Sequence, residues 1–146
     1  MIKRILAVAA LCLIGATAVF SAENQHENRE AAMKKNGAAM GALAAIAKGE
    51  KDYDAEVVKA ALTSVKEAIT VFPTYFPDGS DKDDDEASPK IWENKADFEA
   101  KAAQLAADAD ALLAQLPADK AAIGAAMGTL GKSCGGCHEV YRVKKG

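Results

Sequence analysis

Apolar residues recur at alternating steps of four and three along three segments of this 146-residue chain, and at steps of seven, three and four along one more. This spacing restricts the fold more than any other feature. Steps of four and three place side chains on one face of an α-helix, as in the seam of a helical bundle. The four series are Met33, Met40, Leu43 and Ala47; Val58, Leu62, Val65, Ile69 and Phe72; Phe98, Ala102, Leu105, Ala109, Leu112 and Leu116; and Ile123, Met127, Leu130, Cys134, Cys137 and Tyr141. No stretch alternates as a strand would, so the chain is expected to be all-α.

Residues that cap or stop helices mark the boundaries of the four expected segments. In chain order they are Gly49, Asp54, Pro73, Ser88 with Pro89, Pro117 and Asp119. The first helix is expected over residues 24–48, and the third is expected to run unbroken from Ser88 to Leu116. Four amphipathic helices with mostly short connections predict an antiparallel, up-down-up-down four-helix bundle.

The last series contains Cys134, Cys137 and His138 in the order Cys-x-x-Cys-His, which is the attachment motif of c-type haem. Two thiols on adjacent turns of one helix can each add to a vinyl group of the same porphyrin. The residue that follows then offers its imidazole to the iron. The expected cofactor is therefore one haem c, bound near the C-terminus through two thioethers, with His138 as the proximal iron ligand.

Three other uses of the two cysteines are less consistent with the sequence. A disulfide between Cys134 and Cys137 would close a very short loop and would stabilise little. A thioredoxin-like redox pair needs a β-α-β context, which the sequence lacks. A structural zinc site needs four ligands, and the other histidine of the chain, His26, lies far from the motif.

The N-terminus has the pattern of a secretory signal peptide. Lys3 and Arg4 precede an uncharged run over residues 5–20, and small residues follow it. The run is short and no stop-transfer pattern follows, so no stable membrane insertion is expected. We therefore expect a signal peptide over residues 1–22, with Ala18 and Ser21 as alternative cleavage points, and a single domain over residues 23–146. The predicted location is the bacterial periplasm.

Charge limits the classes of partner. The chain has 18 basic and 21 acidic residues, and two of the basic ones lie in the predicted signal. An acidic mature protein is not expected to bind nucleic acid. The connection over residues 73–88 is strongly acidic and is expected to be a solvated loop, with a docking patch for a basic redox partner as the alternative. The expected partners are periplasmic redox proteins, and the protein is expected to be a monomer or homodimer.

Bundle geometry also predicts the second axial ligand. The first and fourth helices of such a bundle are antiparallel, and His138 lies about two turns from the end of the fourth. The residue that binds the iron on the side opposite His138 should therefore lie two or three turns into the first helix. Met33 lies there and offers a thioether, a known haem ligand that raises the reduction potential. Met40, one heptad later, is expected to form part of the haem pocket wall, and His26, one heptad earlier, is the alternative ligand. Met127 is expected in the core.

These residues resemble a known family. The segment 29–37, Met40, the segments 45–50 and 88–92, and the C-terminal haem motif resemble the class II c-type cytochromes, the cytochrome c′ superfamily. The likeness covers nearly the whole mature chain. Within the superfamily these segments are similar to the low-spin branch called cytochrome c-556, whose first helix carries a methionine. In the high-spin members an apolar residue commonly occupies that position and leaves the iron open to small gases.

The resemblance implies a role for each candidate site residue. Cys134 and Cys137 would be the thioether sites, His138 the proximal ligand and Met33 the distal ligand. Arg142 matches a basic residue that lies near the haem edge in relatives. The alternative for Arg142 is a charge that favours the helix dipole.

The predicted ligands favour electron transfer as the function. A six-coordinate haem has no vacant site for a substrate, so the protein is expected to be a periplasmic one-electron carrier and not an enzyme. One alternative is a five-coordinate, high-spin protein that binds nitric oxide or carbon monoxide. The other is a helical bundle without haem that serves as an interaction module.

Overall fold

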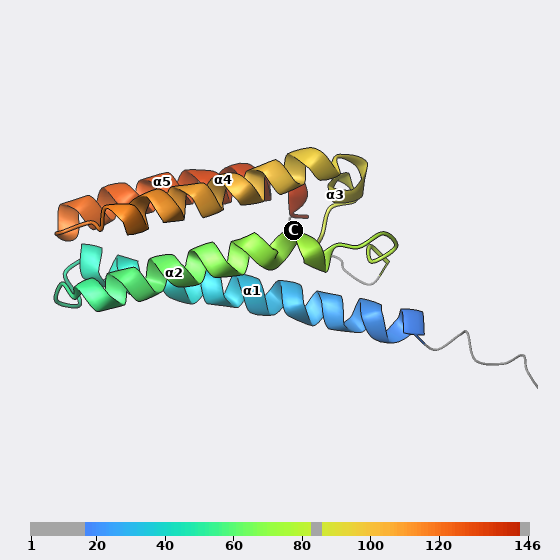
Figure 1. Ribbon diagram of the computed structural model, residues 1–146, viewed down its shortest axis with the longest axis horizontal. Helices are drawn as coiled ribbons and strands as arrows, with labels where there is room; N and C mark the ends of the chain where they lie inside the picture. Colours follow the sequence, from blue (N-terminus) through green and yellow to red (C-terminus); the bar gives the residue numbers. More distant parts are fainter. Residues whose placement is uncertain (1–16, 83–85, 144–146) are drawn as a thin grey trace, which may run out of the picture.

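The computed structural model describes residues 17–82 and 86–143, with side chains from residue 24 onward. Within these ranges the chain is helical apart from its connections and one isolated bridge between Ala87 and Arg142, so the all-α expectation is confirmed (Figure 1). The long helices are α1 (Thr17–Ala47), α2 (Ala55–Val71), α4 (Lys95–Ala114) and α5 (Lys120–Tyr141). The short elements are the 3-10 helix η1 (Phe72–Tyr75) and α3 (Lys90–Glu93).

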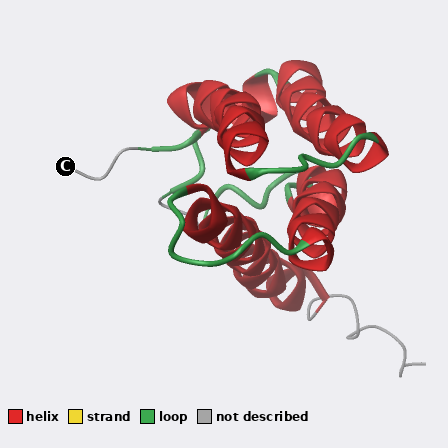
Figure 2. Cartoon of the chain, turned by 90° about the vertical axis from the view of Figure 1, so that its left-hand side faces the viewer, coloured by secondary structure: helices red, strands yellow, loops and turns green. Residues whose placement is uncertain are grey.

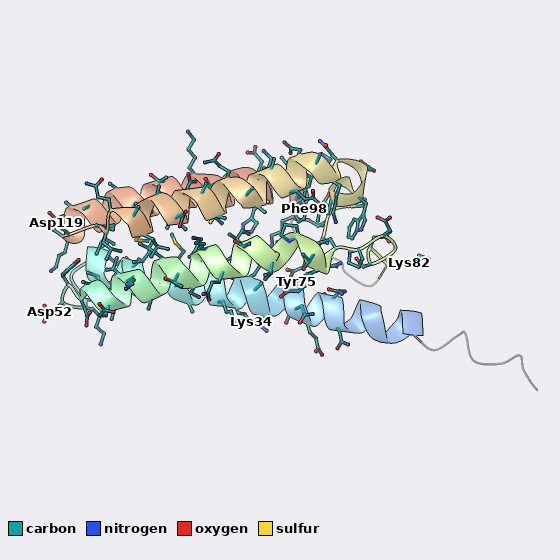
Figure 3. The ribbon with its side chains drawn as sticks, in the orientation of Figure 1. Lys34, Asp52, Tyr75, Lys82, Phe98 and Asp119 are labelled. Atoms are coloured by element: carbon teal, nitrogen blue, oxygen red, sulfur yellow. The ribbon has the colours of Figure 1, made fainter. Side chains whose placement is uncertain are left out.

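The four long helices form the predicted antiparallel bundle. Among the described residues, α1 contacts α2 and α5, and α4 contacts the same two helices. The diagonal pairs, α1 with α4 and α2 with α5, make no contact there. The helices therefore stand at the corners of a square, which is visible when the bundle is seen from its end (Figure 2). The two short connections lie at one end, with Asp52 and Asp119, and the long connection with Lys82 lies at the other (Figure 3).

The capping residues act as the sequence predicts. The carboxylate of Asp54 accepts hydrogen bonds from the backbone N–H groups of Glu56 at 2.9 Å and Val57 at 3.3 Å. That of Asp119 accepts one from Ala122 N–H at 2.8 Å. Gly49, directly after α1, has a φ of 78°, the left-handed conformation in which glycine commonly ends a helix.

Two of the expected boundaries were wrong. The first helix begins at Thr17 instead of residue 24, because no proline or glycine interrupts the chain between them. The third is broken at Asn94, whose φ of −135° and ψ of 58° separate α3 from α4. Asn94 stands at the N-cap position of α4, where asparagine is a preferred residue. The Trp92 indole N–H also donates to Pro77 O at 3.0 Å and ties α3 to the long connection.

The core consists of two clusters of buried side chains. The larger one lies between the long helices and is built from the predicted apolar series. Its members include Leu43, Ile46, Val58, Leu62, Val65, Ile69, Leu105, Ala109, Ile123 and Leu130. The smaller one lies beside the long connection and consists of Phe76, Ile91, Phe98 and Tyr141. Figure 3 shows Phe98 between α4 and α2, which are in contact, near this end of the bundle.

Candidate haem-binding site

A cavity of about 380 Å³ is lined by residues of both core clusters and by α1 and α5. From the first helix it is lined by His26, Arg29, Glu30, Met33, Asn36, Gly37 and Met40, and from the end of the last by Cys134, Cys137, His138, Tyr141 and Arg142. Ile69, Phe72, Phe98 and Leu105 add apolar surface. The structure thus brings every predicted site residue into one cavity, together with Met40 and the alternative ligand His26.

A wider depression of about 680 Å³ lies elsewhere, on the outer surface of α1 and α2. Small and charged side chains such as Ala60, Lys35 and Glu67 line it, and it contains no cysteine, histidine or methionine. It therefore offers neither an attachment point nor an axial ligand for a haem.

The positions of the lining residues show which side chains face one another. On α1 they extend from His26 to Met40, and Met33 is halfway between these two. At the other end of the chain they extend from Cys134, on α5, to Arg142, directly after that helix. The two helices are antiparallel and in contact, so the early residues of α1 lie near the end of α5. Met33 and His138 therefore line one cavity from facing helices, and their assignment as the two axial ligands stays a prediction.

The two cysteines contact different parts of the core. Cys134 packs against the larger cluster and Cys137 against the aromatic one, and both are free thiols. Burial is the main cause that raises the pKa of each thiol. A thiol that stays protonated is a poor nucleophile, so these cysteines lack the character of a redox-active pair.

The environment of His138 favours its neutral form. Burial lowers the pKa of His138, and the nearby positive charge of Arg142 lowers it further. Arg142 is itself at the cavity mouth, where its Nη2 lies 3.5 Å from Oε2 of Glu86. Because only a neutral imidazole has a free lone pair, this environment suits His138 to bind a metal. Arg142 lines the same cavity, and its place near the haem edge stays a prediction.

Tyr141 closes the cavity beside the motif and was expected only as a bundle residue. Its hydroxyl donates to Oδ2 of Asp97 at 2.6 Å, and its ring meets that of Phe98 edge-on with centroids 5.3 Å apart. Burial, followed by the bond to Asp97, raises the pKa of Tyr141 to about 12. The pair thereby fixes the end of α5 to the start of α4.

We expect Tyr141→Phe to lower the free energy of unfolding by about 1–2 kcal/mol, since it removes one hydrogen bond to a carboxylate that is about half exposed. The folded-state pKa of about 12 lies above the unfolded value of about 10. The hydroxyl therefore stabilises the fold fully below pH ~10, and this contribution is lost as the pH rises towards 12. Denaturant unfolding of both proteins at pH 7 and pH 11 measures the difference. This account would be contradicted if the difference in the free energy of unfolding between wild type and Tyr141→Phe were larger at pH 11 than at pH 7. It would also be contradicted if Tyr53→Phe, at an exposed site, lowered that free energy equally.

Arg29 is a second residue whose role the sequence did not reveal. It is only 5% exposed, and its Nε donates to Tyr75 O at 2.8 Å. Its Nη2 donates to the hydroxyl of Ser80 at 2.6 Å, and its guanidinium lies 4.0 Å from the ring centroid of Phe76. Arg29 thus holds the long connection against α1 at the cavity mouth.

The acidic connection is only partly a solvated loop. Asp78 and Asp81 are exposed as expected, whereas Ser80 is buried against Arg29, and residues 83–85 lie outside the described part. Beyond them, Ser88 N–H donates to Tyr141 O at 3.0 Å and connects the chain to the end of α5. The predicted docking patch is not tested by these contacts.

Other kinds of site find no support in the described residues. No group of three or more histidine, cysteine, aspartate or glutamate side chains there is arranged to hold a metal ion, which argues against structural zinc. None of the helices in the described ranges is both long and apolar enough to cross a membrane.

The residues present fit a haem. The lining is largely apolar and includes two free thiols and two candidate axial ligands. It also includes Asn36, whose buried Oδ1 has no hydrogen-bond partner among the described residues. Such an atom is expected where another molecule completes the site. Cys134, Cys137, His138 and Met33 are the residues suited to hold the group.

Comparison with known proteins agrees with this geometry. Residues 24–142 match the family described as Cytochrome C′. A cytochrome c-556 of Agrobacterium tumefaciens (strain apple 185) is 57% identical over 120 residues, which cover 82% of this chain and 95% of the relative. The structure of oxidized R. palustris cytochrome c556 is 37% identical with a TM-score of 0.75, covering 85% of this chain and 99% of that one. Cytochrome c′ from Rhodopseudomonas palustris is also 37% identical with a TM-score of 0.75, covering 81% and 94%.

The family match covers almost the whole described chain, and the fold, the Cys-x-x-Cys-His motif and the cavity agree with it. The resemblance to class II cytochromes is therefore confirmed. The chain belongs to the cytochrome c′ family and is a c-type cytochrome whose cofactor is covalently bound haem c.

Proposed function

We propose that this cytochrome is a one-electron carrier with a low-spin haem. Cys134 and Cys137 form the thioethers, His138 is the proximal ligand and Met33 is the distal ligand. The observation that supports the proposal is that Met33 and His138 line the same cavity from two antiparallel helices in contact. When bound, haem c supplies one-electron chemistry through its ferric and ferrous states.

The side chains around the cavity would support this role. The thioether of Met33 occupies the sixth coordination position and favours the reduced state, which raises the reduction potential. Phe98 and Leu105 exclude water from the cavity wall and keep the local dielectric low. Arg142 and Glu86 form a polar mouth at which a redox partner can approach.

We also propose that the protein works in the periplasm. The signal peptide predicted over residues 1–22 falls largely outside the described residues, and the family match begins at residue 24, directly after the predicted cleavage point. The mature domain is then residues 23–146. Its partners would be periplasmic redox proteins, and the proposal assigns it no enzymatic activity.

A second candidate is a gas-binding protein of the high-spin type. It is favoured by the structural likeness to a cytochrome c′, which equals the likeness to a cytochrome c556 in both identity and TM-score. In this alternative Met33 would not bind the iron, and the distal side would accept nitric oxide or carbon monoxide.

Optical spectra of the purified holoprotein, with and without carbon monoxide, test the proposal. We expect a low-spin spectrum in both oxidation states, a near-infrared methionine band in the ferric state, and only slow, weak binding of carbon monoxide by the ferrous protein. A redox titration should follow a single one-electron step. Rapid, stoichiometric binding of carbon monoxide by the wild-type protein would reject the carrier in favour of the second candidate.

A further inference from the structure

Asn36 places a buried carboxamide in the distal wall of the cavity. The residue is 8% exposed, and its Oδ1 has no hydrogen-bond partner among the described residues. It lines the cavity on α1 between Met33 and Met40. The charged lining residues of α1, Arg29 and Glu30, precede Met33 on the helix, whereas Asn36 follows it by three residues.

An unpaired amide at this place needs an explanation. Buried polar groups in folded proteins nearly always have a partner, and leaving one unpaired destabilises the fold. A leucine would fill the same space without that cost. The partner is therefore expected among the groups that face the cavity when the haem is bound.

Helix geometry makes the Met33 side chain the neighbour of this amide. Residues three apart on an α-helix lie on one face, with about 5–6 Å between their Cβ atoms. Helical side chains also lean towards the N-terminus, so Asn36 leans over the turn that carries Met33. A thioether sulfur is a weak hydrogen-bond acceptor, and a 180° rotation of the carboxamide exchanges its acceptor for its donors.

We propose that Asn36 is a positioning residue for the sixth ligand: its side-chain N–H donates a hydrogen bond to Sδ of Met33 and holds the thioether towards the iron. This inference rests on the proposed function, because it requires Met33 to be a ligand. The bond gives the buried amide a hydrogen-bond partner. It uses one lone pair of the sulfur and leaves the other for the iron. It also restricts the rotation of the Met33 side chain, so an incoming ligand displaces the thioether less readily.

Cyanide binding to four ferric holoproteins tests the inference: wild type, Asn36→Leu, Met33→Ala and the double variant. Cyanide competes with Met33 for the iron, while in the Met33→Ala background there is no thioether to displace. We expect Asn36→Leu to raise the apparent cyanide affinity about two- to fivefold more with Met33 present than without it, as for one weak hydrogen bond. The ferric methionine band should also shift in Asn36→Leu. Asn28→Leu, on an exposed position of the same helix, is the matched control and should change neither quantity.

The possible results distinguish a failure of this inference from a failure of the proposed iron ligation by Met33. If Asn36→Leu changes cyanide affinity by the same factor in both backgrounds, Asn36 acts on the incoming ligand and the inference is overturned, although Met33 remains a ligand. The same conclusion follows if Asn36→Leu raises thermal stability while affinity and band stay unchanged. If wild type and Met33→Ala share one spectrum and one cyanide affinity, the proposed ligation itself fails and the inference fails with it.

Discussion

Replacing Met33 with leucine is expected to convert the haem from six- to five-coordinate, so that the ferrous protein binds carbon monoxide. Leucine keeps the volume and apolar character of the side chain but has no donor atom. If the open form of the wild type is populated at roughly 0.1–10%, the apparent affinity for carbon monoxide should rise about 10- to 1,000-fold. The near-infrared methionine band should disappear, and the reduction potential should fall. Spectroscopic titration and potentiometry measure these changes.

Met40→Leu is the matched control for this substitution. It makes the same chemical change on the same helix and in the lining of the same cavity, but one heptad further along the chain. We expect it to leave carbon monoxide binding and the methionine band unchanged. If Met40→Leu opens the iron and Met33→Leu does not, Met40 is the distal ligand. If neither does and the wild type remains low-spin, His26 becomes the candidate.

The bundle could be predicted from the sequence because the apolar spacing and the capping residues that specify its helices are local. The second series illustrates this, since Val58, Leu62 and Val65 are each no more than 1% exposed. Capping by Asp54 and Asp119 is equally local, because each carboxylate binds N–H groups within three residues. Antiparallel connection of such helices then fixes which ends face one another. That is why Met33 and His138, far apart in the sequence, could be predicted to line one cavity.

The features that could not be predicted depend on contacts between distant segments. The hydrogen bond from Trp92 to Pro77, which ties α3 to the long connection, has no local signal in the sequence. The break at Asn94 does have one, because asparagine is a preferred N-cap residue, and the prediction of an unbroken helix overlooked it. Arg29 would ordinarily be read as an exposed helix charge, but it is buried by the long connection that it binds. Likewise, the pairing of Asp97 with Tyr141 joins two helices through one hydrogen bond that no local pattern encodes.

Substituting both Cys134 and Cys137 with alanine is expected to abolish covalent haem attachment completely. Both thiols line the cavity on the helix that carries His138, and among the described residues these are the free cysteines. Either single variant should retain haem through its remaining thioether. Acid extraction into organic solvent, combined with the intact mass of the chain, distinguishes bound from released haem. Ser133→Ala, which changes the neighbouring residue on the same helix, should remain covalently loaded.

The double variant also shows what the covalent bond contributes to stability. His138, Met33 and the apolar wall can still bind haem reversibly, so the melting temperature should then depend on the free haem concentration, following RT ln(1 + [L]/Kd). The wild type, whose haem cannot dissociate, should melt at a temperature independent of added haem. Haem that resisted extraction from the double variant would show that another side chain carries the attachment. A wild-type chain without the mass of haem would instead support a bundle that acts without a cofactor.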